Sequence, residues 1–73
     1  MSKNANAVLV TLGKNIRRLR ISQEISQNQL AYETDLSREY INKVESGKYN
    51  ISVKKLYKIT EALDVDIEDF FKD

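Results

Sequence analysis

The residues with the clearest chemical potential are consecutive: positions 38–43 read Arg-Glu-Tyr-Ile-Asn-Lys. An arginine can bind guanine O6 and N7 through two hydrogen bonds, and a glutamate can accept one from cytosine N4. Asparagine and lysine one helical turn later can also reach base edges, and tyrosine can touch a thymine methyl group or a phosphate. We therefore expect a helix that reads DNA bases in the major groove. Its candidate base contacts are Arg38, Glu39, Tyr40, Asn42 and Lys43.

Each of these candidates also has a plainer interpretation. Arg38 and Glu39 could form the solvated first turn of an ordinary helix. Tyr40 is as well suited to packing its ring against the preceding helix as to touching DNA. Asn42 could point sideways, away from a groove. The residues alone leave these alternatives open.

A second group of polar residues is suited to binding phosphates. Hydroxyls, side-chain amides and backbone N–H groups at helix starts and in loops commonly hold the DNA backbone. The loop after residue 47 could instead be an ordinary turn. The phosphate candidates are Ser26, Gln27, Ser37, Lys48, Tyr49 and Asn50.

Residues 26–48 must position both groups, and they predict two short helices joined by a tight turn. Ser26 precedes Gln29 by three residues, which is the spacing of a capping box. The apolar period then breaks at residues 35–37, and the serine that ends the break can cap a second helix. Gly47 is well placed to end that helix. Two helices joined in this way form a helix-turn-helix.

The remaining sequence also predicts helices. Leu9, Leu12, Ile16 and Leu19 recur at the three- and four-residue spacing of one helix face. Gly13 lies inside that helix and makes its boundary uncertain. No stretch alternates with a period of two, so the predicted fold is all-α with five helices. They cover residues 8–23, 27–34 and 38–46, then a fourth helix capped by Ser52 and a short fifth capped by Asp66.

The length allows one small domain. We expect residues 1–7, which lack periodicity, to form a flexible arm, and residues 8–73 to form a single domain that ends in a dimerisation helix. The 73 residues include no cysteine and no histidine, which excludes disulfides, thiolate or imidazole catalysis and Cys/His zinc sites. No membrane span or signal sequence is evident, so we expect a cytoplasmic protein with neither cofactor nor metal.

The charge is distributed unevenly along the chain. Residues 1–58 carry a net charge of +6 and residues 59–73 a net charge of −5, which together give +1. This asymmetry favours one surface that faces a polyanion, although small helical domains also scatter their charges by chance. Three lysines of the fourth helix are interpreted as a solvated face that contributes only a long-range field. They are Lys54, Lys55 and Lys58.

The chain resembles the Cro/phage-repressor type, or XRE-like, helix-turn-helix regulators over roughly residues 12–71. The resemblance implies a compact five-helix lambda-repressor-like domain that binds DNA. Within it, the segments SREYIN and GKYNIS are similar to controller proteins of restriction-modification systems. The residues that carry the resemblance are Arg20, Ser26-Gln27, Leu30-Ala31, Leu36-Ser37, Tyr40-Ile41, Glu45-Ser46-Gly47-Lys48 and Ala62-Leu63-Asp64-Val65.

The resemblance also implies roles for individual residues. Arg20 and Glu45 occupy the positions of a structural ion pair, and Gln27 occupies that of a phosphate contact which supports the recognition helix. Recognition contacts fall on Ser37, Arg38, Glu39 and Lys43. Two departures are that Asp35 replaces the usual glycine of the turn and that the loop over 48–52 lacks the common proline.

One recognition helix covers few base pairs, so such domains usually bind two half-sites about 34 Å apart as a two-fold dimer. The apolar residues left over near the C-terminus are the candidate interface: Val65, Ile67, Phe70 and Phe71. Because Phe70 and Phe71 are adjacent, we expect one to close the core and the other to meet a partner. The alternative is that both are core residues.

The expected function is sequence-specific binding of double-stranded DNA by a homodimeric transcription regulator, which would also contact RNA polymerase if it activates. The alternative is an antitoxin-type protein-interaction module that also binds DNA, although little sequence lies outside the domain to hold a toxin. An enzyme is not expected. Its acid-base chemistry would need carboxylates or lysine, and the acidic residues cluster near the C-terminus without an evident pocket.

Overall fold

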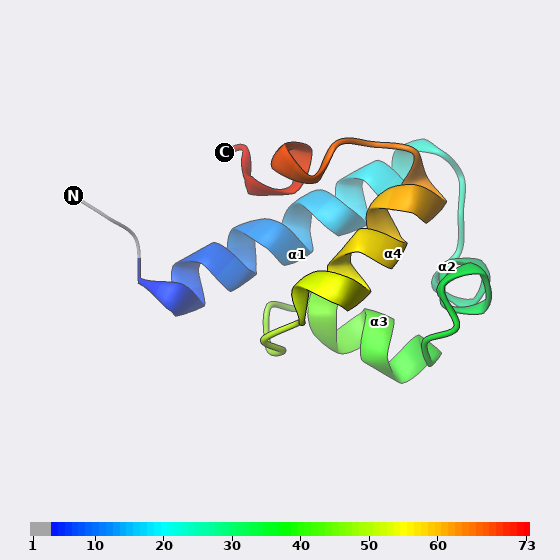
Figure 1. Cartoon of the computed structure of the whole chain (residues 1–73), viewed down its shortest axis with the longest axis horizontal. Coiled ribbons are helices and arrows are strands. Elements are labelled where there is room, and N and C mark those ends of the chain that lie inside the picture. Colours follow the sequence, from blue (N-terminus) through cyan, green and yellow to red (C-terminus); the bar gives the residue numbers. More distant parts are fainter. Residues whose placement is uncertain (1–3) are drawn as a thin grey trace.

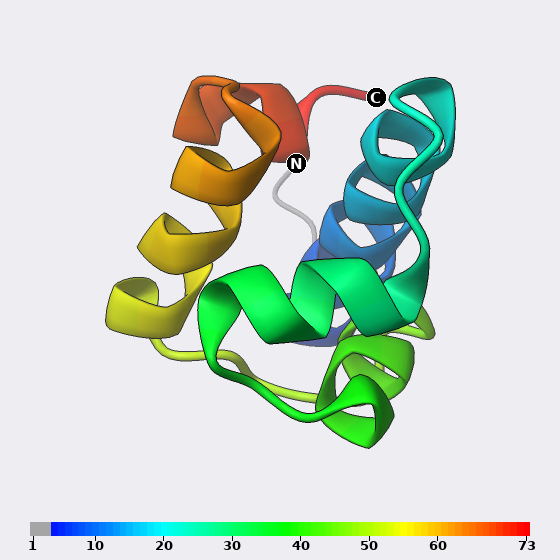
Figure 2. The same ribbon diagram turned by 90° about the vertical axis from the view of Figure 1, so that its right-hand side faces the viewer.

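A computed structural model describes residues 4–73, in which four α-helices are followed by one 3-10 helix. Figure 1 shows α1 as the longest helix, with its N-terminal end projecting beyond the other elements. Figure 2 shows the body of the molecule, where α2 and α3 meet below α4 and η1. The elements are α1 (Ala5–Ser22), α2 (Gln27–Thr34), α3 (Arg38–Glu45), α4 (Val53–Leu63) and η1 (Ile67–Phe71). The described residues contain no strand, which confirms the all-α prediction.

Each α-helix begins after a side chain that accepts a hydrogen bond from the backbone N–H three residues later. Asn4 caps α1 in this way, so α1 begins three residues before the expected start at residue 8. Residues 5–7, which we expected to belong to an N-terminal arm, are thus part of α1, and residues 1–3 lie outside the described part. The other caps are the three predicted serines, Ser26, Ser37 and Ser52.

The ends of the helices are closed by left-handed residues. Gly47 has φ = 78°, and its N–H and that of Lys48 donate to the carbonyl oxygens of Val44 and Lys43. This pair of bonds is the Schellman motif, and it ends α3 one residue before the expected position. Asp35, which replaces the usual glycine of the turn, takes a left-handed conformation with φ = 57°.

The C-terminal segment is a 3-10 helix rather than the expected fifth α-helix. Asp66 is the N-cap residue as predicted, and its backbone N–H donates to the Asp69 carboxylate at 3.2 Å. A segment of five residues commonly closes with i to i+3 bonds because it is too short to gain from the wider α-helical pattern. The buried Asn15 of α1 holds it in place by donating to the carbonyl oxygens of Phe70 (2.8 Å) and Lys72 (2.6 Å).

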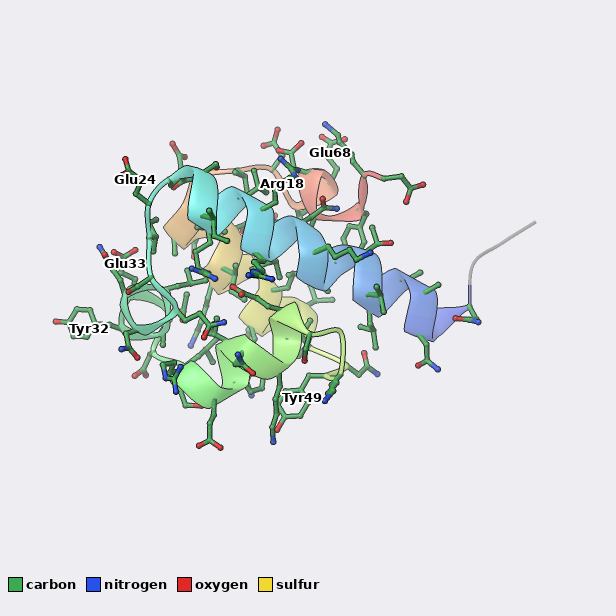
Figure 3. The ribbon with its side chains drawn as sticks, turned by 180° about the vertical axis from the view of Figure 1, so that it is seen from behind. Arg18, Glu24, Tyr32, Glu33, Tyr49 and Glu68 are labelled. Atoms are coloured by element: carbon green, nitrogen blue, oxygen red, sulfur yellow. The ribbon has the colours of Figure 1, made fainter. Side chains whose placement is uncertain are left out.

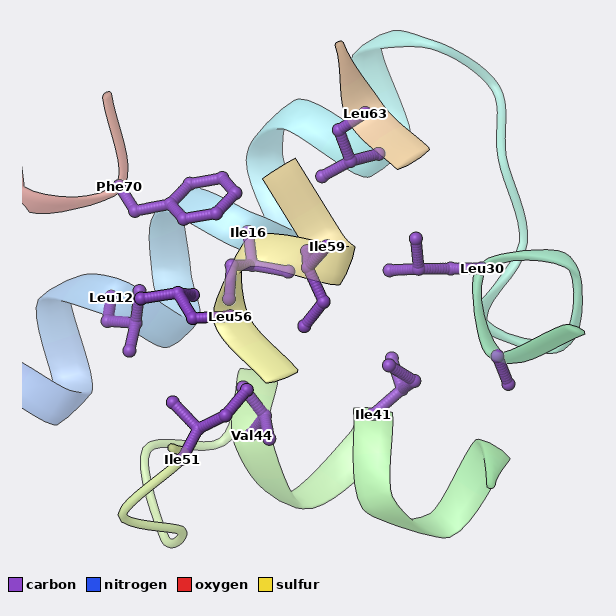
Figure 4. Close-up of a cluster of buried hydrophobic side chains, with 11 residues drawn as sticks. Leu12, Ile16, Leu30, Ile41, Val44, Ile51, Leu56, Ile59, Leu63 and Phe70 are labelled. Carbon is purple, nitrogen blue, oxygen red and sulfur yellow. The ribbon is translucent and has the colours of Figure 1, made fainter. Parts of the chain in front are cut away.

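One apolar core joins all five elements and the loop before α4 (Figure 4). Leu12 and Ile16 of the predicted stripe belong to it, whereas Leu9, Leu19 and Ala62 are only half-buried at its edge. Phe70 is completely buried, whereas its neighbour Phe71 is 46% exposed. The buried members are Leu12, Ile16, Leu30, Ala31, Ile41, Val44, Ile51, Leu56, Ile59, Leu63 and Phe70.

Gly13 lies where α1 crosses α3, and its role is to allow a close approach. A Cβ atom added there would lie 2.5 Å from the carbonyl oxygen of Val44 and 2.6 Å from that of Glu45. These are backbone atoms, which cannot move without shifting α3 itself. Gly13, which made the helix boundary uncertain in the sequence, therefore sets the spacing between α1 and α3.

We predict that Gly13→Ala destabilises the protein. In an exposed helix this change would stabilise by about 1 kcal/mol, but here the methyl group overlaps the α3 backbone and overpacking costs about 1–3 kcal/mol. Urea unfolding monitored by circular dichroism measures the effect. Ser22→Ala, at the exposed last residue of the same helix, is the control and should change stability far less. A Gly13→Ala variant as stable as the wild type would contradict the assigned close approach.

Candidate nucleic-acid interface

The helix α3 presents a polar face to solvent and an apolar face to the core. Ile41 and Val44 are fully buried, while the four side chains Arg38, Glu39, Asn42 and Lys43 are exposed. Ser37 caps the start of this helix through its hydroxyl, which accepts from the N–H of Tyr40 at 3.0 Å. Four of the five candidate base contacts are therefore exposed on this one helix.

Tyr40 is the exception among the base candidates. It is half-buried, and its ring lies 5.1 Å from that of Tyr49 with the planes tilted by 56°. Burial raises the pKa of the Tyr40 phenol above its ordinary value, and the neighbouring Tyr49 adds to the rise. The ring therefore packs against the loop after α3, a contact that the sequence analysis did not consider. Nothing in the local sequence pattern indicates this pairing, because it depends on how the loop folds back.

The Arg20–Glu45 ion pair implied by the family resemblance is present. The Arg20 Nε atom lies 2.6 Å from Glu45 Oε2, and Arg20 Nη2 donates to Glu45 Oε1 at 3.0 Å. The two side chains are only 10% and 4% exposed. The remaining Arg20 nitrogen, Nη1, donates to the carbonyl oxygen of Ile25 at 2.8 Å. A fork-to-fork pair with its remaining donor satisfied is the favourable way to bury two charges.

Gln27 extends this pair to a third helix. Its Nε2 atom donates to Glu45 Oε1 at 3.0 Å, so Glu45 at the end of α3 is bound by both α1 and the first residue of α2. Gln27 thus supports α3, as the resemblance implied. Its contact with a phosphate stays a prediction.

A polar hollow of about 430 Å³ lies beside this network, between α1, α2 and α3. Asn42 lines it from α3, so this side chain lies at the flank of the helix, the sideways position that sequence reasoning had left open. Arg17, which the sequence analysis did not name, lines it from α1. The signal for Arg17 was available, because it precedes Arg20 by three residues and so shares its helix face. The lining residues are Arg17, Arg20, Gln27, Asn42, Glu45 and Ser46.

The other phosphate candidates lie at the two margins of α3. Ser26 and Ser37 are exposed at helix starts. Lys48 and Asn50 are exposed in the loop after α3, and Tyr49 between them is half-buried with its hydroxyl 3.3 Å from Lys43 Nζ. Figure 3 shows Tyr49 beside α3.

Two other kinds of site are absent from residues 4–73. No helix in that range is long and apolar enough to cross a lipid bilayer. No three histidine, cysteine, aspartate or glutamate side chains of that range meet in a group that could hold a metal ion.

Known proteins share both the sequence and the shape of this chain. The helix-turn-helix family model matches residues 16–70. The control protein C.BamHI of Bacillus amyloliquefaciens is 38% identical over 88% of this chain and 80% of its own length. The control protein C.MunI of a Mycoplasma species is 32% identical over 93% of each chain.

Among solved structures, the restriction-modification controller protein C.AhdI of Aeromonas hydrophila superposes with a TM-score of 0.85. It is 37% identical and covers 89% of this chain and 98% of its own. The chain therefore belongs to the helix-turn-helix family of DNA-binding transcription regulators, which are not enzymes.

Proposed function

We propose that this protein binds a specific operator as a homodimer, with α3 of each protomer in the major groove of double-stranded DNA. The observation that carries the proposal is the exposed polar face of α3, which is held by a buried ion pair at its C-terminal end. A helix in the major groove contacts base edges first with its N-terminal residues. Arg38 and Glu39 hold those positions in α3.

The proposed roles divide between bases and backbone. Arg38, Glu39 and Lys43 are assigned to base edges. Asn42 is assigned to a contact at the side of the groove. Tyr40 is assigned to a contact whose direction depends on the loop after α3, because its ring packs against that loop. Backbone contacts position a protein and carry no sequence information directly. They are assigned to Ser26, Gln27, Ser37, Lys48, Tyr49 and Asn50.

The relatives favour a regulator over an antitoxin. C.BamHI and C.MunI are named as control proteins, and C.AhdI as a restriction-modification controller. We infer that this chain likewise controls the genes of a restriction-modification system. If it activates transcription, RNA polymerase is a further partner.

The proposed dimer interface needs one correction to the expected residues. Phe70 is fully buried in its own core and cannot contribute an exposed surface, so it leaves the interface. Phe71 is 46% exposed and is the strongest remaining candidate, with the half-buried Val65 and Ile67 on the same C-terminal segment. The helix α4, which packs against η1, adds Val53 and Tyr57, two exposed apolar residues one turn apart that sequence reasoning did not name.

We predict that Arg38→Ala abolishes sequence preference while non-specific binding persists. A bidentate arginine–guanine contact contributes about 1–3 kcal/mol of discrimination, or roughly a fivefold to 150-fold preference. Fluorescence anisotropy with a duplex selected by the wild type from a random pool, and with its scrambled version, measures the preference. If Arg38→Ala discriminates between the duplexes as well as the wild type, α3 does not read the bases as proposed.

We predict a different result for Lys48→Ala, because a phosphate contact carries no sequence information. Affinity for both duplexes should fall by the same factor, and the slope of log K against log salt should become shallower by about 0.9. Lys58→Ala, which removes the same charge from the exposed part of α4, is the control and should leave the slope nearly unchanged. Equal effects of the two variants would refute the assignment of the loop.

We predict that Phe71→Ser dissociates the dimer, since it removes exposed apolar surface that only a partner would cover. Sedimentation velocity at micromolar concentration should show a dimer for the wild type and a monomer for the variant. Tyr32→Ser, which alters an aromatic residue that is 87% exposed on α2, is the control and should remain dimeric. A wild-type protein that is monomeric both alone and on DNA would remove the dimer from the proposal.

A further inference from the structure

Lys55 contacts the ring of Tyr40, although the sequence analysis placed it on a solvated face. It lies in the first turn of α4, and its Nζ atom sits 4.8 Å from the centre of the Tyr40 ring. An ammonium group over a tyrosine face is attracted by the negative electrostatic potential that the ring quadrupole creates there. Lys55 therefore connects α4 to a side chain of α3, the helix assigned to base reading.

Tyr40 is held from a second direction by the loop after α3. The Tyr49 ring lies 5.1 Å from it, and Lys43 Nζ in turn lies 5.3 Å from the centre of the Tyr49 ring. Lys43 also donates to the Tyr49 hydroxyl at 3.3 Å. We call these four residues the tyrosine clasp: Tyr40, Lys43, Tyr49 and Lys55. The clasp ties the start of α4 and the loop to α3.

The clasp restricts Tyr40 before any ligand arrives. Its ring has a cation over one face and a tilted aromatic neighbour, both supplied from outside α3. A side chain that is already confined loses less conformational freedom on binding. The Tyr40 phenol is protonated at neutral pH like that of any tyrosine, and burial raises its pKa further, so the hydroxyl is available as a hydrogen-bond donor. The ring that carries this donor is held by two residues to which the sequence analysis gave other roles.

We propose that Lys55 and Tyr49 are positioning residues that hold Tyr40 for DNA recognition, so that the tyrosine clasp contributes to sequence specificity. The proposal rests on the function proposed above. It differs from the plain alternative that Lys55 is one more cation near the phosphates. A positioning residue alters the preference between sequences, whereas a phosphate contact alters affinity for all sequences alike.

The first test compares Lys55→Met with Lys54→Met. Methionine keeps most of the stem and removes the charge, and Lys54 is the adjacent exposed lysine of the same helix turn. Affinities for the selected and scrambled duplexes are measured over a series of salt concentrations. Lys55→Met should lower the preference for the selected duplex about two- to fivefold, which corresponds to about 0.5–1 kcal/mol. Lys54→Met should leave the preference unchanged. Lys55→Arg should keep the wild-type preference, because a guanidinium also stacks on tyrosine.

A second measurement reports on the clasp without DNA. In protein with isotope-labelled tyrosine, the ring resonances of Tyr40 should shift in Lys55→Met and stay in place in Lys54→Met. Thermal unfolding of both variants checks that the fold is retained. Tyr49→Leu, which removes the second contact, should lower the preference in the same direction as Lys55→Met.

The inference is overturned if Lys55→Met weakens both duplexes by one factor and flattens the salt dependence as a phosphate contact does. It is also overturned if the preference is unchanged. Failure of the function proposed above would look different, because the wild type itself would then select no sequence from the pool. If Arg38→Ala abolishes the preference and Lys55→Met does not, the proposed function stands and the clasp does not contribute.

Discussion

The structure depends on the buried pair between Arg20 and Glu45. Two charges in a low-dielectric interior are tolerated only with good geometry, and removing one partner of such a pair typically costs about 3–5 kcal/mol. Here the pair is doubly hydrogen-bonded, and Gln27 adds a bond from a third helix. Gly13 lets α1 approach α3 closely enough for the pair to form where the helices cross. These buried contacts thus fix the position of α3 and, with it, the direction of its exposed polar face.

The helix α3 is held by two different kinds of interaction. At the C-terminal end of α3, charge and a Schellman motif fix the backbone. Along its flank, the ring of Tyr40 is confined by Tyr49 and by Lys55 from the start of α4. The first device sets where the helix lies. The proposed second device sets how one side chain of that helix points.

Local rules predicted much of this molecule because its helices begin and end with local signals. Serine caps and apolar spacing follow from residues within a few positions of one another. The early start of α1 and the 3-10 form of the last helix were local misses. The other misses were long-range contacts. Three contacts join residues far apart in the chain. They are the close approach of α3 to Gly13, the hydrogen bonds of Asn15 to the C-terminal carbonyls, and the Lys55–Tyr40 contact. The ion pair was found only because a family resemblance carried the long-range information that spacing lacks.

The most direct test of the account is to map the DNA-binding face by the amide chemical shifts of isotope-labelled protein during titration with its selected duplex. The account predicts the largest shifts at residues 26–28, 37–43 and 48–50. The amides in the second half of α4 should shift much less. The largest shifts at η1 and the C-terminal half of α4, with residues 37–43 unmoved, would contradict it.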